Sequence, residues 1–112
     1  MSKFKINYSI KNEYDDINSV TKATLKDEVL YYKEEDKTKV QYNYDNRRLE
    51  RTNDNMSMVY DFKEGIAIID VKTVGSTIKL KLESVDYQRD GVNVTEKYKL
   101  EDEIIEFRIE VI

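Results

Sequence analysis

The chain has 112 residues, of which 38% are charged and 39% hydrophobic, and its 19 basic and 23 acidic side chains leave a formal net charge of −4. This length predicts a single domain, residues 1–112, with one core. The charges form no long single-sign run, so neither a nucleic-acid interface nor an electrostatic anchor on anionic lipid is expected. Histidine and cysteine are absent, which excludes Ser–His and Cys–His catalysis, disulfides and the zinc sites built from these ligands.

The beginning of the chain predicts a cytoplasmic protein. Met1-Ser2-Lys3 leads directly into alternating sequence without the apolar core of a signal peptide. No apolar run approaches the ~20 residues that a membrane helix requires. The lack of cysteine suits a reducing compartment.

Apolar and polar residues alternate with a period of two along most of the chain, which predicts β-strands with one buried face. The alternating segments run from Phe4 to Ile10, Val40 to Tyr44, Met58 to Phe62, Ile78 to Leu82, Val92 to Leu100 and Ile105 to Val111. Residues Ile66 to Val71 form an apolar run instead, interrupted only by Asp70. This run predicts a strand that is covered on both sides or that lies at the most enclosed point of a barrel.

Turn residues separate these segments at intervals of about 8 to 12 residues, which is typical of an antiparallel sandwich or barrel. The turns are predicted at Asp15-Asp16, Glu64-Gly65, Gly75-Ser76 and Asp90-Gly91. Asp90-Gly91 is the clearest hairpin signal, because both positions tolerate the positive φ of a tight turn.

Two stretches also fit helical spacing, one from Ile17 to Leu25 and one from Ile104 to Ile112. Strands are favoured for both, because valine, threonine and isoleucine lose rotamer freedom in a helix. In the second stretch, alternation also accounts for Phe107 and Val111, which a helix would leave exposed.

The order of these segments resembles a known family. The residues that carry the likeness are Val29-Leu30-Tyr31-Tyr32, Val40-Gln41-Tyr42-Asn43-Tyr44, Leu49-Glu50-Arg51, Met56 to Phe62, Gly75-Ser76-Thr77-Ile78-Lys79-Leu80, Val94 to Leu100 and Phe107 to Val111. In this pattern the chain resembles the YwiB-like family of small bacterial proteins, a domain of unknown function with a calycin-like barrel. Thr73-Val74 stands where that family often has an aromatic residue and a proline. The resemblance implies no reaction, ligand or catalytic residue.

We therefore expect an all-β fold: a single antiparallel, up-and-down, calycin- or lipocalin-like β-barrel of eight to ten strands. Its interior is expected to be apolar with tyrosines, and its exterior charged. Tyr31 and Tyr32 are neighbours on one strand and must face opposite ways, so one of them is expected to be exposed.

No metal, cofactor or catalytic residue is predicted. Asp86 to Gly91 followed by Glu96 resembles a calcium loop, but the closing glutamate falls at position eleven and Lys97 takes the twelfth, so a hairpin turn is favoured. Asn53-Asp54-Asn55 and Asp15-Asp16 are also interpreted as turns.

The candidate ligand-binding residues are large side chains on the apolar phase of their strands, which we expect to line the barrel: Tyr42, Tyr44, Met58, Tyr60 and Tyr98. Barrels of about eight strands either fill their interior or hold one small ligand. The leading hypothesis is a noncatalytic module that binds a small apolar or amphipathic molecule in the barrel mouth. The alternative is a protein-interaction or structural module with a filled barrel, and an enzyme that relies on carboxylates or tyrosines comes third.

Overall fold

The computed structural model describes residues 2–112, which form ten β-strands joined by short turns. The strands are β1 (Ser2–Lys11), β2 (Asp16–Lys26), β3 (Val29–Lys33), β4 (Lys39–Asn43), β5 (Arg48–Thr52), β6 (Met56–Asp61), β7 (Ile66–Val71), β8 (Ser76–Asp90), β9 (Asn93–Leu100) and β10 (Glu103–Val111). Both stretches with helical spacing are strands, β2 and β10, so the strand prediction is confirmed there. Within residues 2–112, no helix has the length and apolar character needed to cross a membrane.

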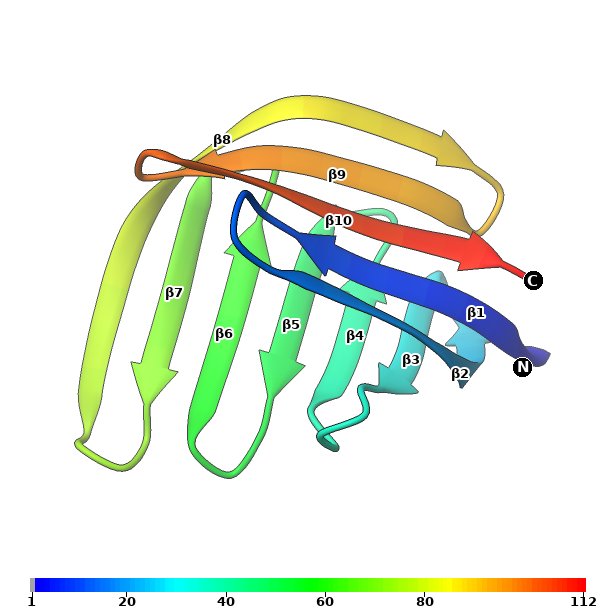
Figure 1. The fold of residues 1–112 in the computed structure, drawn as a ribbon, viewed down its shortest axis with the longest axis horizontal. Coiled ribbons are helices and arrows are strands. Elements are labelled where there is room, and N and C mark those ends of the chain that lie inside the picture. Colours follow the sequence, from blue (N-terminus) through cyan, green and yellow to red (C-terminus); the bar gives the residue numbers. More distant parts are fainter. Residues whose placement is uncertain (1) are drawn as a thin grey trace.

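The ten strands form one closed antiparallel barrel in which each strand pairs with its neighbours in the chain and β1 pairs with β10. The predicted all-β, up-and-down, calycin-like barrel is therefore confirmed. Figure 1 shows β3 to β7 standing side by side, while β1, β2, β9 and β10 cross over them as a second layer. β8 belongs to both layers, and a bulge between Ser84 and Asp86 allows it to bend.

The up-and-down connections place the turns at two ends of the barrel. We call one the terminal end, because both ends of the described chain lie there; it carries the turns at residues 27–28, 44–47, 62–65 and 91–92. The distal end carries the turns at residues 12–15, 34–38, 53–55, 72–75 and 101–102.

Alternation along the strands places a hydrophobic cluster inside the barrel, and aromatic side chains make up much of it. Six of the nine tyrosines are buried, namely Tyr8, Tyr32, Tyr42, Tyr44, Tyr60 and Tyr98. Tyr31 is exposed and its neighbour Tyr32 is buried, which confirms that the two face opposite ways. Most of the tyrosines therefore line the interior of the barrel.

The structure corrects two local expectations. Of the two alternatives for the apolar run of β7, a strand covered on both sides is wrong: Ala67 faces inward and is fully buried, while Ile66 and Ile68 face outward and are half-buried. The hairpin turn predicted at Asp90-Gly91 is confirmed but lies one residue later, at Gly91-Val92 between β8 and β9. Gly91 has a φ of 64°, the left-handed conformation that glycine adopts without steric cost.

Candidate ligand-binding site at the distal end

Two arginines close the terminal end of the barrel. The Arg47 guanidinium lies 4.0 Å from the centroid of the Tyr87 ring, and the Arg89 guanidinium lies 4.4 Å from the centroid of the Tyr44 ring. The Tyr44 hydroxyl donates a hydrogen bond to the Val92 carbonyl at 2.6 Å, which anchors this ring to the β8–β9 turn. Arginine stacked on tyrosine covers apolar ring surface, so this end is capped by the chain itself.

A buried glutamate stands beneath this cap. Glu96 is fully buried and accepts hydrogen bonds from the Tyr42 hydroxyl at 2.7 Å and from Arg47 Nε at 3.0 Å and Nη2 at 2.6 Å. The hydrogen bond with Glu96 raises the pKa of Arg47 above its ordinary value. Burial, and then the charge of Glu96, raises the pKa of Tyr42 well above that of a free tyrosine. This carboxylate is therefore bound on several sides by the chain's own donors.

A second arginine–glutamate pair lies toward the distal end. Arg51 binds Glu34 through two nearly parallel hydrogen bonds, Nε to Oε2 at 2.8 Å and Nη2 to Oε1 at 2.7 Å. The Glu34 side chain is only 3% exposed and that of Arg51 14%. Burial, the largest single cause, would lower the pKa of Arg51, but its hydrogen bonds with Glu34 and the charge of Glu34 together raise it above its ordinary value. The pair is thus a fixed, charged part of the interior wall.

These two pairs correct the expectation that charges lie only on the exterior. The alternation could have predicted that one member of each pair faces inward. Glu96 is on the same phase as Val94 and Tyr98, and Arg51 is on the same phase as Leu49. The sequence did not show their partners, because Arg47 and Glu96 are 49 positions apart in the chain. A charged side chain that faces inward is tolerated only when a side chain of opposite charge binds it there.

A row of inward-facing side chains crosses the distal half of the barrel. The register pairs Tyr32 with Val40, Val40 with Arg51, Arg51 with Met58, Met58 with Ile69, and Ile69 with Ile78, so neighbouring members lie on adjacent strands. The β7–β8 end of this row is more exposed than its β3–β4 end. Tyr32 and Val40 are buried, Ile69 is half-buried, and Ile78 is 44% exposed although it lies on the inward phase of β8. The row therefore leads from the core to uncovered apolar surface on the wall of the distal end.

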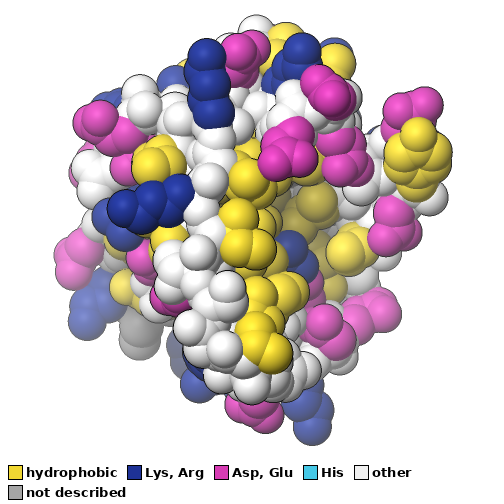
Figure 2. All heavy atoms as spheres, turned by 90° about the vertical axis from the view of Figure 1, so that its left-hand side faces the viewer, with side chains coloured by type: hydrophobic (Ala, Val, Ile, Leu, Met, Phe, Trp, Pro, Cys, Tyr) yellow, Lys and Arg dark blue, Asp and Glu magenta, His cyan; other side chains and the backbone are white. Residues whose placement is uncertain are grey.

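The distal end is hollowed and apolar. Figure 2 shows this side of the molecule, where hydrophobic side chains gather in a central hollow and acidic side chains stand along its rim. Half-buried hydrophobic residues on the inward phases of the distal ends of the strands include Ile10, Met56, Ile69, Leu80, Leu100 and Ile105. Ile17, opposite Ile10 on β2, is 38% exposed. No arginine–tyrosine stack is found at this end among residues 2–112.

The rim of this hollow is acidic. The five distal turns contain eight acidic residues and two lysines, whereas the four turns of the terminal end contain four acidic and two basic residues. The distal turns thus carry most of the negative charge that the sequence leaves in excess. This field favours neutral or cationic molecules over anions at the mouth.

The structure divides the five candidate residues between the two ends. Tyr42 and Tyr44 lie in the cap of the terminal end, while Met58 and Tyr98 lie on the inward side nearer the distal hollow. Tyr60 starts from the same cross-strand row as Tyr42, but its hydroxyl reaches toward the distal end and donates to Met58 Sδ at 3.5 Å. All five are buried. The Tyr60 and Tyr98 rings pack 5.9 Å apart, and the five cavities described on residues 2–112 are lined by other side chains. Met58, Tyr60 and Tyr98 thus form a packed floor beneath the hollow.

One polar atom in this region has no partner. The Tyr32 hydroxyl is buried, and no hydrogen bond to it is present among residues 2–112. Burial, and then the nearby charge of Glu34, raises the pKa of Tyr32 well above its ordinary value, so the group keeps its proton. An unpaired buried hydroxyl is costly, and it supplies a donor for a water molecule or for a polar group of a ligand.

The buried tyrosines make the stability of the barrel sensitive to alkali. Burial raises the pKa of Tyr32, Tyr42, Tyr44, Tyr60 and Tyr98. Below the unfolded value of about 10 these groups are protonated in both states, so they add no pH dependence. Above it the unfolded chain loses protons that the folded chain keeps, and stability must fall. We expect a free energy of unfolding that is independent of pH near 9 and declines above about pH 10, measured by urea unfolding; an unchanged value up to about pH 11 would contradict burial of these hydroxyls.

Comparison with protein-family models, with curated proteins and with solved structures gave no match. The resemblance to the YwiB-like family is not tested by these comparisons and stays a prediction. The class that the fold defines is a closed, ten-stranded, up-and-down antiparallel barrel with one capped end and one hollow end.

Proposed function

We propose that this protein is a noncatalytic module that binds a small apolar or amphipathic molecule in the hollow at the distal end. The observation that carries the proposal is the difference between the two ends. The terminal end is covered by Arg47 and Arg89 stacked on tyrosines, whereas the distal end leaves inward-phase aliphatic side chains such as Ile78 uncovered. Apolar surface left inside a concave site is where small ligands bind.

The described contacts indicate how such a molecule would bind. Its apolar body would lie on Ile69 and Ile78, with Met58, Tyr60 and Tyr98 as the floor. A polar group would meet either the unpaired Tyr32 hydroxyl or the acidic rim. We therefore restrict the proposed site to three of the five candidate residues, because Tyr42 and Tyr44 already bind within the terminal cap.

Two further points belong to the proposal. Calycin-like barrels as a class offer a mouth for small ligands, but the same fold serves many functions, so this likeness supports the proposal only by analogy. A cytoplasmic location is also proposed, supported by the absence of cysteine. In this proposal the two interior ion pairs, Arg47–Glu96 and Arg51–Glu34, stabilise the barrel and do not bind the ligand.

Ile78 provides the test of the mouth. Replacing Ile78 with lysine places a charge on the wall of the hollow and is expected to weaken binding of the neutral fluorescent probe N-phenyl-1-naphthylamine at least about tenfold, since a charge in an apolar site is costly. The measurement is a fluorescence titration of the probe. Ile104 is the matched control, because it is 51% exposed on the outward phase of β10 at the same end.

Ile104→Lys is expected to bind the probe as the unchanged protein does. Equal loss in the two variants, or no fluorescence increase with the unchanged protein, would contradict a ligand site in the hollow. Melting temperatures of both variants separate a lost site from a lost fold.

A further inference from the structure

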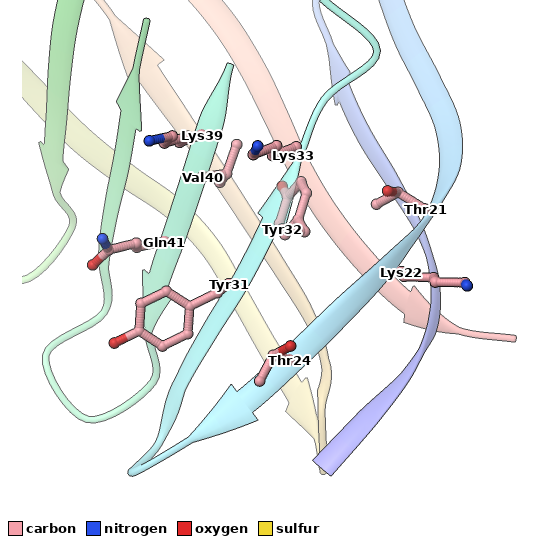
Figure 3. Close-up of a pocket in the computed structure, with 9 residues that line it drawn as sticks. All are labelled: Thr21, Lys22, Thr24, Tyr31, Tyr32, Lys33, Lys39, Val40 and Gln41. Carbon is pink, nitrogen blue, oxygen red and sulfur yellow. The ribbon is translucent and has the colours of Figure 1, made fainter. Parts of the chain in front are cut away.

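Strand β2 extends beyond its partner. β2 pairs with β1 along the whole of residues 16–25, but it pairs with β3 only from Ala23 to Lys26. The segment Asp16 to Lys22 therefore has no paired residue on the β3 side. Figure 3 shows β2 and β3 separating in a V from the turn that joins them. At roughly 3.3 Å per residue, the unpaired edge is about 20 Å long.

The main chain of this edge directs unpaired hydrogen-bonding groups across the gap toward β3, in the plane of the sheet. The Asn12 amide donates to the Asp15 carbonyl at 2.9 Å, which makes these two residues a hydrogen-bonded pair at the β1–β2 turn. Hydrogen-bonded pairs alternate along an antiparallel ladder, so the even-numbered residues of β2 direct their amide and carbonyl groups away from β1. Asn18 and Val20 thus face the gap, and Val20 is 52% exposed. An unpaired row of this kind is a template for another strand.

A groove follows this edge, and the two halves of the groove have opposite charge. One part, of about 460 Å³, is lined by Lys22 of β2 and by Lys33 and Lys39 across the gap (Figure 3). The next part, of about 350 Å³, is lined by Asp16 and by Glu35 and Asp36 of the β3–β4 turn. The groove is thus basic where the V closes and acidic where it opens.

The basic half is crowded with like charge. Lys33 lies directly opposite Lys39, and Lys22 lies directly opposite Lys5 on β1. Like charges in directly opposed positions destabilise a sheet. No ion pair is found for these four lysines within residues 2–112. Carboxylates from another molecule would relieve this repulsion.

We infer that this edge is a self-complementary interface through which a second copy of the chain binds, β2 against β2 in antiparallel orientation. Pairing centred on Ser19 sets Asn18 opposite Val20 of the second copy, and both of these residues direct their main-chain groups into the gap. The same register sets Asp16 opposite Lys22 of the second copy and, by symmetry, Lys22 opposite its Asp16. The acidic half of each groove therefore meets the basic half of the other, as a two-fold interface requires.

The β3–β4 turn leaves the outer side of the groove available. Its tip is held from the inner side, because the Glu35 amide donates to the Tyr8 hydroxyl at 3.0 Å and the Ser19 hydroxyl donates to Glu35 at 2.5 Å. Tyr8 and Ser19 lie on the inward phase of their strands. The incoming strand would approach from the outward phase, where Asp16, Val20 and Lys22 are exposed.

Charge reversal at the two ends of the edge tests this interface. Sedimentation equilibrium of the unchanged protein over a concentration series is expected to show a monomer–dimer equilibrium that weakens with added salt. Asp16→Lys and Lys22→Glu are each expected to weaken the dimer at least about tenfold, because each places two like-charged contacts across the two-fold axis. Both positions are exposed, and unchanged melting temperatures would show that the variants fold.

One double variant and one mixture make the test specific. The double variant Asp16→Lys/Lys22→Glu is expected to regain the dimer, and the two single variants are expected to associate with each other when mixed, because their charges are then opposite at both contacts. A protein that stays monomeric up to about 1 mM would overturn the inference. A dimer whose affinity is the same in all the variants would also overturn it, since the contact would then lie elsewhere.

Discussion

Replacing Glu96 with alanine is expected to lower the free energy of unfolding by about 3–5 kcal/mol, because removal of one partner leaves the other charge of a buried ion pair uncompensated. Glu96 is fully buried and is the hydrogen-bond acceptor for both Arg47 and Tyr42. Its loss leaves the Arg47 guanidinium and the Tyr42 hydroxyl in the terminal cap without this acceptor. Urea unfolding followed by tyrosine fluorescence measures the change.

Glu28 is the matched control. It also pairs with an arginine of the cap, Arg89, at 3.0 Å, but both side chains are substantially exposed. Glu28→Ala is therefore expected to cost less than about 1 kcal/mol. The double variant Arg47→Met/Glu96→Ala is expected to recover part of the loss, since it removes the stranded charge. Equal effects of the two single substitutions would show that the pair with Glu96 is not buried in solution.

Replacing Phe107 with alanine is expected to lower the free energy of unfolding by a similar amount, about 3–5 kcal/mol, through loss of burial and creation of a cavity. Phe107 is fully buried on β10, and its ring centroid lies 5.5 Å from that of Tyr42. It therefore joins the last strand to the opposite wall of the barrel. Thermal and urea unfolding of the variant provide the measurement.

Phe4 is a control of the same residue type. It lies on the inward phase of β1 but is only half-buried. Phe4→Ala is expected to cost clearly less than Phe107→Ala, because less apolar area leaves water there on folding. A larger effect at Phe4 would mean that the centre of packing lies nearer the chain termini than the structure places it.

The strands and their inward faces could be predicted from local alternation. β1, β4, β6, β9 and β10 follow the period of two, and the inward phases of Tyr42, Tyr60 and Tyr98 are those that the structure buries. Alternation is informative because each strand contacts the core on one side only. The apolar run that replaces alternation in β7 was misleading, because Ile66 and Ile68 face outward and are half-buried.

The site could be predicted only in part. The sequence indicated that large side chains line the barrel. It did not indicate that Tyr44 lies at the capped terminal end, whereas Met58 lies near the hollow distal end. The assignment depends on Arg89 stacking over Tyr44, a contact between strands distant in the chain. The unpaired edge of β2 was equally hidden, because it results from the short β3 beside a longer strand.

The sequence by itself determined that this chain is one all-β barrel with a tyrosine-rich interior and without histidine or cysteine chemistry, because side-chain period and composition are local properties. Only the tertiary structure decided which inward charges meet, which end is capped and where a strand lacks a neighbour. Arg47 meets Glu96 and Arg51 meets Glu34 because closure of the barrel brings separate strands face to face. Such contacts depend on register and curvature, which no short stretch of sequence contains.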